Sequence, residues 1–236
     1  SSAILSGSVL TGDAIQRLAE NALAMAKLAP PDPYAGIADT DQIATSFPDL
    51  DLVSEHIPSA AQLESLARET EETALAVKGV TKSSGAGAST SDRRVALVIS
   101  NGFARQYRRT GTGFSVSVIA GEDLSMQRDY DYSSAVHFSD LRRPSDVGRE
   151  AGERAVKRIN PRKVKSQSVP VIYDKRVSSG LVGHLLGAIN GAAIARGTSF
   201  LKNDLGKPIF PAGLFIVEDP LRRRGLQHPA EGQVRC

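Results

Sequence analysis

The feature that most constrains the fold of this chain is an apolar segment rich in Gly and Ala at 178–200, SSGLVGHLLGAINGAAIARGTSF. Its apolar residues recur at steps of three and four, which places them on one face of a helix. They are Leu181, Leu185, Ala188, Ala192 and Ala195. A neighbouring stripe of small residues consists of Gly183, Gly187, Gly191 and Ala195. Because glycine inside a helix costs about 1 kcal/mol relative to alanine, such a stripe favours close approach by another backbone. The segment therefore predicts a buried helix over 178–195.

The composition is that of an ordinary globular protein. Of the 236 residues, 41% are hydrophobic and 23% are charged. No apolar run reaches the roughly 18 uninterrupted residues of a membrane span, so we expect no membrane segment. The net charge of +3 is too small to indicate the concentrated basic surface of a nucleic-acid-binding protein. A single cysteine, Cys236, excludes an intrachain disulfide and fits a reducing cytoplasm. The chain lacks an initial methionine and stops abruptly, so we expect both ends to be truncated.

Three further helices are indicated by apolar periodicity and by helix-end signals. The first spans 13–29 and ends at a Pro-Pro pair. The second begins near Ser59, which has capping-box spacing with Gln62. The third spans 144–159, with Pro at its start and basic residues at its end.

Between the second and third helices the pattern changes to strands. The run at 94–100, RVALVIS, is typical of a buried strand, and Asn101-Gly102 is a strong signal for a two-residue hairpin turn. Residues 114–121 alternate large apolar residues with serines, which predicts one buried and one polar face. The run at 126–138 reads as a further strand, and 82–92 is either a loop or a flexible strand. Together these segments predict an antiparallel sheet.

A basic, polar linker at 160–168 is the best domain boundary. Beyond it we expect a strand at 168–174, then the Gly/Ala-rich helix and a short strand at 214–219. The expected fold class is α+β, with an antiparallel sheet and packed helices followed by a second α+β unit around the buried Gly/Ala-rich helix. The expected domains are 1–165, a middle domain, and 166–236, the start of a C-terminal domain.

Several polar residues contain atoms that can bind metals. Asp129, Asp131 and His137 follow one another along a predicted strand, but their spacing matches no compact metal site. Charges on the surface of a strand are the preferred interpretation.

A basic and aromatic strand lies just after the predicted hairpin turn. Arg105, Tyr107 and Arg109 share one face of this strand, as residues of a nucleic-acid patch would. A solvated or partner-facing sheet surface is the preferred interpretation, and nucleic acid is not an expected partner.

Three segments of the sequence resemble a known family. They are EAGERAVKRINPRKVKSQSVPVIYD at 150–174, GLVGHLLGAINGAAIARGTSFL at 180–201 and DPLRRRGL at 219–226. The chain is similar to the TldD/PmbA family, and within it to the PmbA branch, also called TldE. The family is associated with a two-subunit metallopeptidase, and its older description is "modulator of DNA gyrase".

The TldD branch carries the metal motif HExxxH on the corresponding helix. With the Gly-His pairs aligned, Ser179, Gly180 and His184 stand where the motif has His, Glu and His, so only His184 matches. A hydroxyl and a bare backbone cannot replace an imidazole ligand and a general base. The resemblance therefore implies no catalytic residue, metal ligand or cofactor in this chain, and zinc on a partner subunit.

The resemblance also implies partners and a substrate. We expect a TldD-like metal-bearing subunit, with a homodimer as a further possibility, and unfolded or small peptides as substrates. The residues expected to face a partner are Gly183, His184, Gly187, Gly191, Arg105 and Arg109. The alternative is a regulatory or binding protein without enzymatic activity, acting on DNA gyrase.

His184 has a second interpretation that does not involve a metal. A lone histidine on an apolar helix is more often a buried core residue whose two ring nitrogens are hydrogen-bonded.

Overall fold

A computed structural model describes residues 1–31, 36–214, 216–219, 221–225 and 234–235. The chain divides into two compact units, Ser1–Phe47 with Ala96–Gln106, and Pro48–Val95 with Tyr107–Cys236. Each unit is described by itself.

The first unit contains α1, Gly12–Leu28, the short 3-10 helix η1, Thr40–Gln42, and the tip of a long hairpin. The predicted helix at 13–29 is confirmed. None of its residues is buried.

The hairpin tip differs from the expected two-residue turn. The Gly102 amide donates to Ile99 O at 3.1 Å, the Ile99 amide donates to Phe103 O at 2.8 Å, and Gly102 has a φ of +93°. The loop therefore has three residues and a left-handed glycine, a common alternative for hairpins. The Asn101 side chain stabilises it by accepting from the Phe103 amide and donating to Ala38 O.

The prediction that the strand at 94–100 is buried is also wrong. Leu97 is 50% exposed and Val98 75% exposed. They lie at the hairpin tip, where the described part of this unit provides no layer to cover them.

The second unit is built on a three-stranded sheet in the order β1-β2-β3. The strands are β1, Val80–Val98, β2, Ala104–Ala120, and β3, Gln127–Ala135. β2 and β3 pair antiparallel, with Thr112 opposite Ala135 and Ala120 opposite Gln127. The antiparallel sheet is confirmed, and the segment at 82–92, left open between loop and strand, lies within β1.

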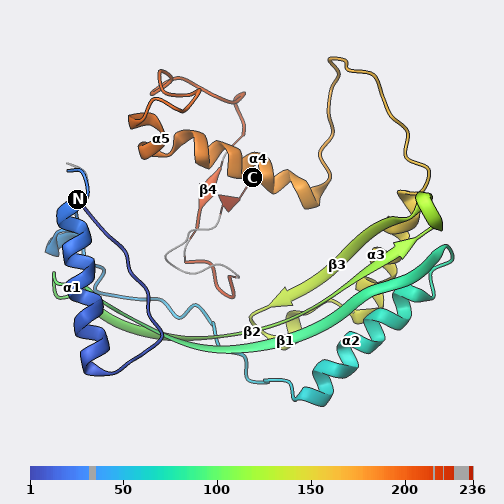
Figure 1. Ribbon diagram of the computed structural model, residues 1–236, viewed down its shortest axis with the longest axis horizontal. Coiled ribbons are helices and arrows are strands. Elements are labelled where there is room, and N and C mark those ends of the chain that lie inside the picture. The colour runs from blue at the N-terminus through green and yellow to red at the C-terminus, as the bar shows by residue number, and fades with distance from the viewer. Residues whose placement is uncertain (32–35, 215, 220, 226–233, 236) are drawn as a thin grey trace. The chain divides into compact units, whose positions relative to one another are not determined.

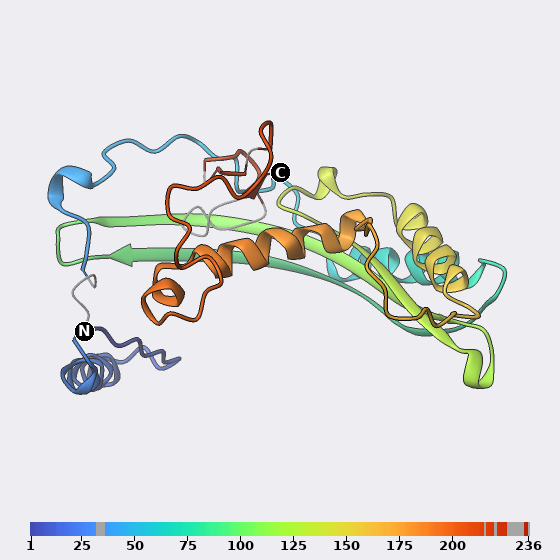
Figure 2. The same ribbon diagram turned by 90° about the horizontal axis from the view of Figure 1, so that it is seen from above.

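Two helices cover one face of this sheet, α2, Ala60–Leu75, and α3, Pro144–Lys157 (Figure 1, Figure 2). The buried core between helices and sheet consists of Ala74, Val116, Val118, Ala120, Ala151 and Ala155. The predicted alternation of β2 is therefore confirmed. The capping box is confirmed too, because the Gln62 amide donates to Ser59 Oγ at 3.3 Å and the Ser59 amide to Gln62 Oε1 at 2.9 Å.

The helices α2 and α3 approach closely at two glycines of α3. A Cβ on Gly148 would collide with the backbone oxygen of Thr70, and one on Gly152 would lie 2.7 Å from Val77 Cγ2 and 3.0 Å from Ala74 O. Here, rather than in the 178–195 segment, glycine allows two backbones of this chain to meet.

The short helices η2, Asp123–Ser125, and η3, Phe138–Asp140, flank β3. After α3 the chain has no regular structure until α4, Lys175–Ile189. The strand expected at 168–174 is therefore wrong. Pro170 removes a backbone donor there, Ile172 is 97% exposed, and neither sheet of the described residues includes the segment.

The remaining elements are α5, Gly191–Ala195, and the pair β4, Val217–Glu218, with β5, Val234–Arg235. The α+β fold class is confirmed. No helix in the described residues is long and apolar enough to cross a membrane.

The glycine contact between α2 and α3 gives a first prediction. Gly148→Ala should lower the free energy of unfolding by about 1–3 kcal/mol, because its methyl group forces the helices apart. Gly183→Ala is the matched control in α4, where a Cβ meets no atom within 4 Å. It should instead stabilise the chain by up to about 1 kcal/mol through helix propensity. Urea unfolding of both variants measures the difference, and equal midpoints would contradict the close packing of α2 on α3.

Candidate functional site

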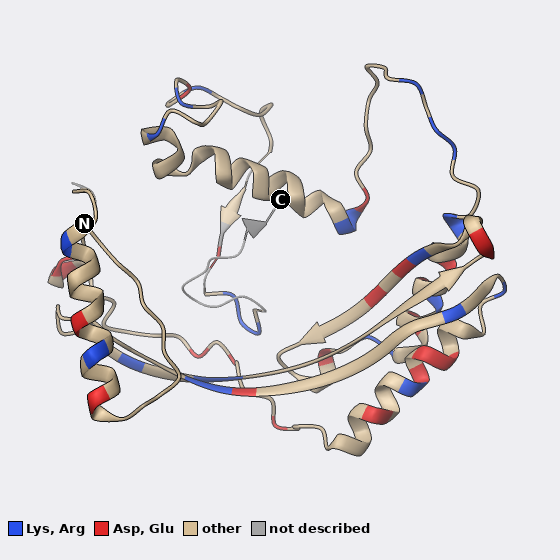
Figure 3. Ribbon diagram, viewed as in Figure 1, with Lys and Arg blue, Asp and Glu red and all other residues tan. Residues whose placement is uncertain are grey.

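The helix that the sequence resemblance aligns with the metal motif of the TldD branch is α4. It begins at its N-cap Asp174, whose Oδ1 accepts from the Arg176 amide at 2.9 Å. Its only Lys and Arg residues lie in the first turn, and the rest of the helix carries no Lys, Arg, Asp or Glu (Figure 3). It ends at Asn190, whose Oδ1 accepts from the amides of Ala192 and Ala193 and so begins α5. The predicted single helix over 178–195 is thus two helices.

The face of α4 with the small residues is exposed. A Cβ built on Gly180, Gly183, Gly187 or Gly191 meets no atom within 4 Å. In α4 only Ala188 is buried. The expectation of a buried helix is therefore wrong within the described residues, and so is the interpretation of His184 as a buried core histidine, because this side chain is exposed.

The residues around His184 do not fit a zinc site. Its helical neighbours three and four positions away are Gly180, Leu181, Gly187 and Ala188, and none carries a ligating atom. Within the part of the chain that the structure describes, no group of three or more His, Cys, Asp or Glu side chains is arranged to hold a metal ion.

The two aspartates of β3 are buried beneath the sheet, which corrects their interpretation as strand-surface charges. Asp129 and Asp131 are each 4% exposed. They lie opposite Val118 and Val116 in the register and so share the face covered by the helices. Buried carboxylates need cationic partners, and arginines supply them.

Each buried carboxylate has its own set of arginines. Asp131 accepts from Arg142 Nη1 at 2.8 Å and lies 2.9 Å from Arg154 Nη1. Asp129 accepts from Arg158 Nη1 at 3.2 Å, and Arg176 from the first turn of α4 completes its set.

Arg176 joins α4 to the edge of β3. Its Nη1 donates to Asp129 Oδ1 at 2.9 Å and to Tyr130 O at 3.1 Å, and its guanidinium carbon lies 5.4 Å from the centre of the Tyr130 ring. Burial raises the pKa of the Asp129 carboxyl, but hydrogen bonds from Arg176, the Tyr130 amide and Arg158 lower it by more, so the pKa lies below its ordinary value. The hydrogen bond to Asp129 raises the pKa of Arg176.

His137 belongs to a second polar cluster, in a hollow of about 460 Å³. Its Nε2 lies 3.0 Å from Asp51 Oδ1, and Arg224 Nε donates to Asp51 Oδ2 at 2.7 Å. The hydrogen bond from Arg224 lowers the pKa of Asp51. Asp51 and Arg224 both have positive φ, +52° and +53°. Arg224 also donates to Asp140, so it ties 221–225 to η3 as well as to Asp51, in the segment before α2.

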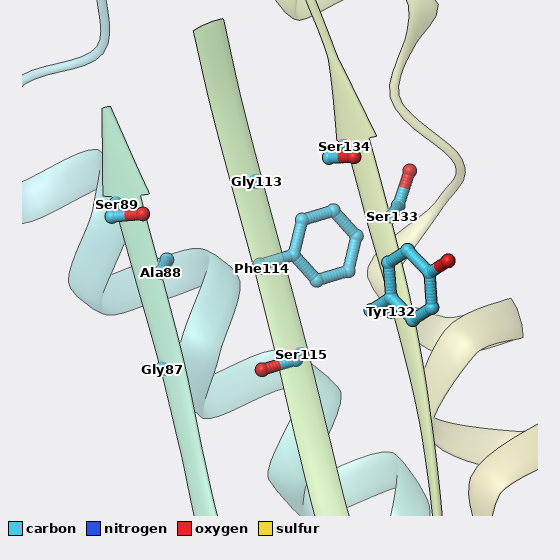
Figure 4. Close-up of a pocket in the computed structure, with 9 residues that line it drawn as sticks. All are labelled: Gly87, Ala88, Ser89, Gly113, Phe114, Ser115, Tyr132, Ser133 and Ser134. Carbon is cyan, nitrogen blue, oxygen red and sulfur yellow. The ribbon is translucent and has the colours of Figure 1, made fainter. Parts of the chain in front are cut away.

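The sheet carries a shallow hollow of about 480 Å³ (Figure 4). It is lined by small and aromatic residues of all three strands: Gly87, Ala88, Ser89, Gly113, Phe114, Ser115, Tyr132, Ser133 and Ser134. None of them is charged, so the hollow offers hydroxyl groups and ring faces but no acid or base.

The two arginines expected to face a partner lie in different units. The guanidinium of Arg105 lies 5.1 Å from the centre of the Phe47 ring. Arg109 is half-buried, and its Nη2 donates to Gly225 O at 2.9 Å. Arg109 therefore holds the chain's own C-terminal segment.

Comparison with known proteins identifies the family. The model of the PmbA/TldA metallopeptidase central domain matches residues 54–159, and that of the PmbA/TldA metallopeptidase C-terminal domain matches residues 166–229. The chain belongs to the PmbA/TldD family.

Curated members of the family support this assignment. Metalloprotease PmbA of Escherichia coli O157:H7 is 38% identical over 218 residues, which are 92% of this chain and 48% of that protein. A metalloprotease PmbA homolog of Haemophilus influenzae is 34% identical over 230 residues, 97% of this chain and 51% of that protein. The chain therefore spans about half the length of these curated relatives.

Solved structures of family members share the fold. A protein of Bacteroides thetaiotaomicron named as a candidate modulator of DNA gyrase matches with a TM-score of 0.80 at 23% identity, over 94% of this chain and 52% of that one. TldE of Thermococcus kodakarensis matches with a TM-score of 0.62 at 18% identity, over 96% of this chain and 50% of that one.

The buried carboxylates give a prediction of pH dependence. Because the folded-state pKa of Asp129 is lowered from 3.8, its contribution to stability is present above pH about 4 and is lost as the pH falls through the folded-state value. Asp129→Asn should cost about 3 kcal/mol at pH 7, since two arginines lose their carboxylate. The loss of stability between pH 7 and pH 3 should then be smaller in the variant than in the wild type, as measured by denaturant unfolding at both pH values.

Asp92→Asn is the control for this experiment. Asp92 pairs with Arg108 at 2.7 Å, but both side chains are 41% exposed. Its removal should cost far less stability at pH 7 than that of Asp129, because solvent screens an exposed pair. A cost for Asp129→Asn no larger than that of the control would contradict the role of the buried pair.

Proposed function

We propose that this chain is part of a PmbA-type subunit, also called TldE, that contributes to peptide hydrolysis only together with a metal-bearing TldD-like partner. The proposal rests on which residues α4 carries at the positions of the metal motif. This helix has the family's position for the metal motif but has Ser179 and Gly180 in place of His and Glu, and His184 has no ligating neighbour. The zinc and the chemistry that it supplies are therefore expected on the partner.

The proposed role of this chain is to bind the partner and to help form the active site of the complex. The exposed small-residue face of α4 suits close contact with a second helix or backbone, because nothing in the described residues occupies the space above its glycines. His184 lies on the same face and would contribute a hydrogen bond rather than a metal bond. Unfolded or small peptides are the proposed substrates, and the cytoplasm the proposed location.

The names of family members support a role in proteolysis. The curated relatives are called metalloproteases, and a structural neighbour is called TldE. The alternative, a modulator of DNA gyrase without enzymatic activity, agrees with the name of another neighbour. The small net charge of +3 provides no support for binding DNA directly.

The test uses the full-length protein with and without its TldD-type partner. Hydrolysis of an unfolded peptide should appear only in the mixture and should disappear with a chelator. The full-length protein alone should remain inactive when one equivalent of zinc is added. Peptide cleavage by the isolated protein with stoichiometric zinc would refute the proposal. Salt-sensitive binding of DNA or gyrase without peptide turnover would favour the alternative.

A variant of the helix face tests where the partner binds. Gly187→Leu should raise the concentration of this subunit needed for half-maximal activity at least tenfold, because the new side chain fills the space above the stripe. Ser178→Leu, which adds similar bulk on a different side of the helix, is the control and should leave the titration unchanged. Identical titration curves for the two variants would place the partner elsewhere.

A further inference from the structure

We propose that Arg176 positions α4 on the sheet through a clasp that holds both sides of the edge of β3. We call this set of contacts the Arg176 clasp, and it consists of Arg176 with Asp129 and Tyr130. The Asp129 side chain lies on the helix-covered face of the sheet, and Tyr130, one residue further, points to the opposite face. One guanidinium therefore contacts both faces and the backbone between them.

The geometry of the clasp depends on arginine. The two terminal nitrogens donate to the two Asp129 oxygens, Nη1 to Oδ1 at 2.9 Å and Nη2 to Oδ2 at 3.4 Å, while the planar group also lies against the Tyr130 ring. Lysine has a single ammonium and no planar face, so it cannot make the fork and the ring contact together. The side chain of Arg176 is 27% exposed and that of Asp129 only 4%, so water competes weakly for this bond.

The clasp ties the first turn of α4 to the edge of β3. The chain between α3 and α4 is exposed from 160 to 174 and has no regular structure. The glycine face of α4 touches nothing in the described residues. The clasp lies in the first turn, and an α-helix rises about 1.5 Å per residue, so positions 179 to 184 follow within about 12 Å of the anchored residue. Fixing Arg176 thus fixes the part of α4 that aligns with the metal motif of the TldD branch.

A second arginine that binds Asp129 provides a control, because it belongs to a different element. Arg158, at the C-terminal end of α3, donates to the same carboxylate at 3.2 Å but makes no contact with α4 that the structure shows. Removing Arg158 weakens the ion cluster and leaves the clasp in place. Removing Arg176 leaves Asp129 with Arg158 and releases α4.

The first measurement is hydrogen exchange of the full chain, and it does not depend on the proposed function. Arg176→Ala and Arg176→Lys should both speed amide exchange in residues 177–184 at least tenfold. Arg158→Ala should change exchange there by less than twofold. Denaturant unfolding of each variant confirms that the sheet and its helices remain folded. Exchange in Arg176→Ala within twofold of the wild type would overturn the clasp.

The second measurement concerns the partner and rests on the proposed function. In the mixture with the TldD-type subunit, Arg176→Lys should raise the half-maximal subunit concentration about tenfold, with kcat at saturation unchanged, and Arg158→Ala should not. Faster exchange in 177–184 with an unaltered titration would overturn the role of α4 position in partner binding. A wild-type mixture without activity would refute the proposed function, while the exchange result would still decide the clasp.

Discussion

The buried carboxylates Asp129 and Asp131 are the constraint on which the arrangement of this molecule depends. A charge taken out of water is costly unless it is paired, so each carboxylate requires arginines at fixed places around it. Arg154 and Arg158 are four residues apart on α3, about 6 Å along the helix axis, and the two aspartates are two residues apart, about 7 Å along β3. The matching repeats fix the register of α3 against the strand, in addition to the apolar packing of Ala151 and Ala155. Asp129 also binds Arg176, in the first turn of α4.

Local patterns in the sequence were sufficient to predict most of the elements of the fold. The capping box at Ser59, the apolar periodicity of 144–159 and the alternation in 114–121 all correspond to observed elements. These signals come from residues that are near one another in the chain, so they can be recognised without knowing the tertiary structure. The run at 168–174 has the composition of a strand, yet a strand exists only where another strand pairs with it, and composition does not show whether a partner is present.

Which side chains are buried was harder to predict than which segments are helices or strands. The predictions for the candidate site were wrong mainly for this reason. Asp129 and Asp131 alternate with tyrosines, a pattern that fits either face of the sheet. The decisive signal was the pair of arginines four residues apart on the following helix, and it becomes readable only when α3 is known to lie on β3. The glycine stripe of 183 and 187 was correctly placed on one helix face, but the glycines that meet another backbone within this chain are Gly148 and Gly152. Sequence shows which positions are small, and the fold decides which of them are covered.

The energetics of α4 connect these observations to function. Its three internal glycines, Gly180, Gly183 and Gly187, cost about 3 kcal/mol in helix propensity relative to alanine. At Gly148 such a cost is offset by packing that no larger residue permits, whereas on α4 no described atom lies where the packing would be. Leu181 and Ile189 are also about half exposed, at 48% and 49%. Within the described residues the helix is held at its first turn by the N-cap Asp174 and by Arg176, and near its other end by the Ser199 hydroxyl, which donates to Ala188 O at 2.6 Å. A second protein that covers the glycine face, where no described atom lies, would add further stabilisation, and the contact of Arg176 with β3 links the position of that face to the sheet.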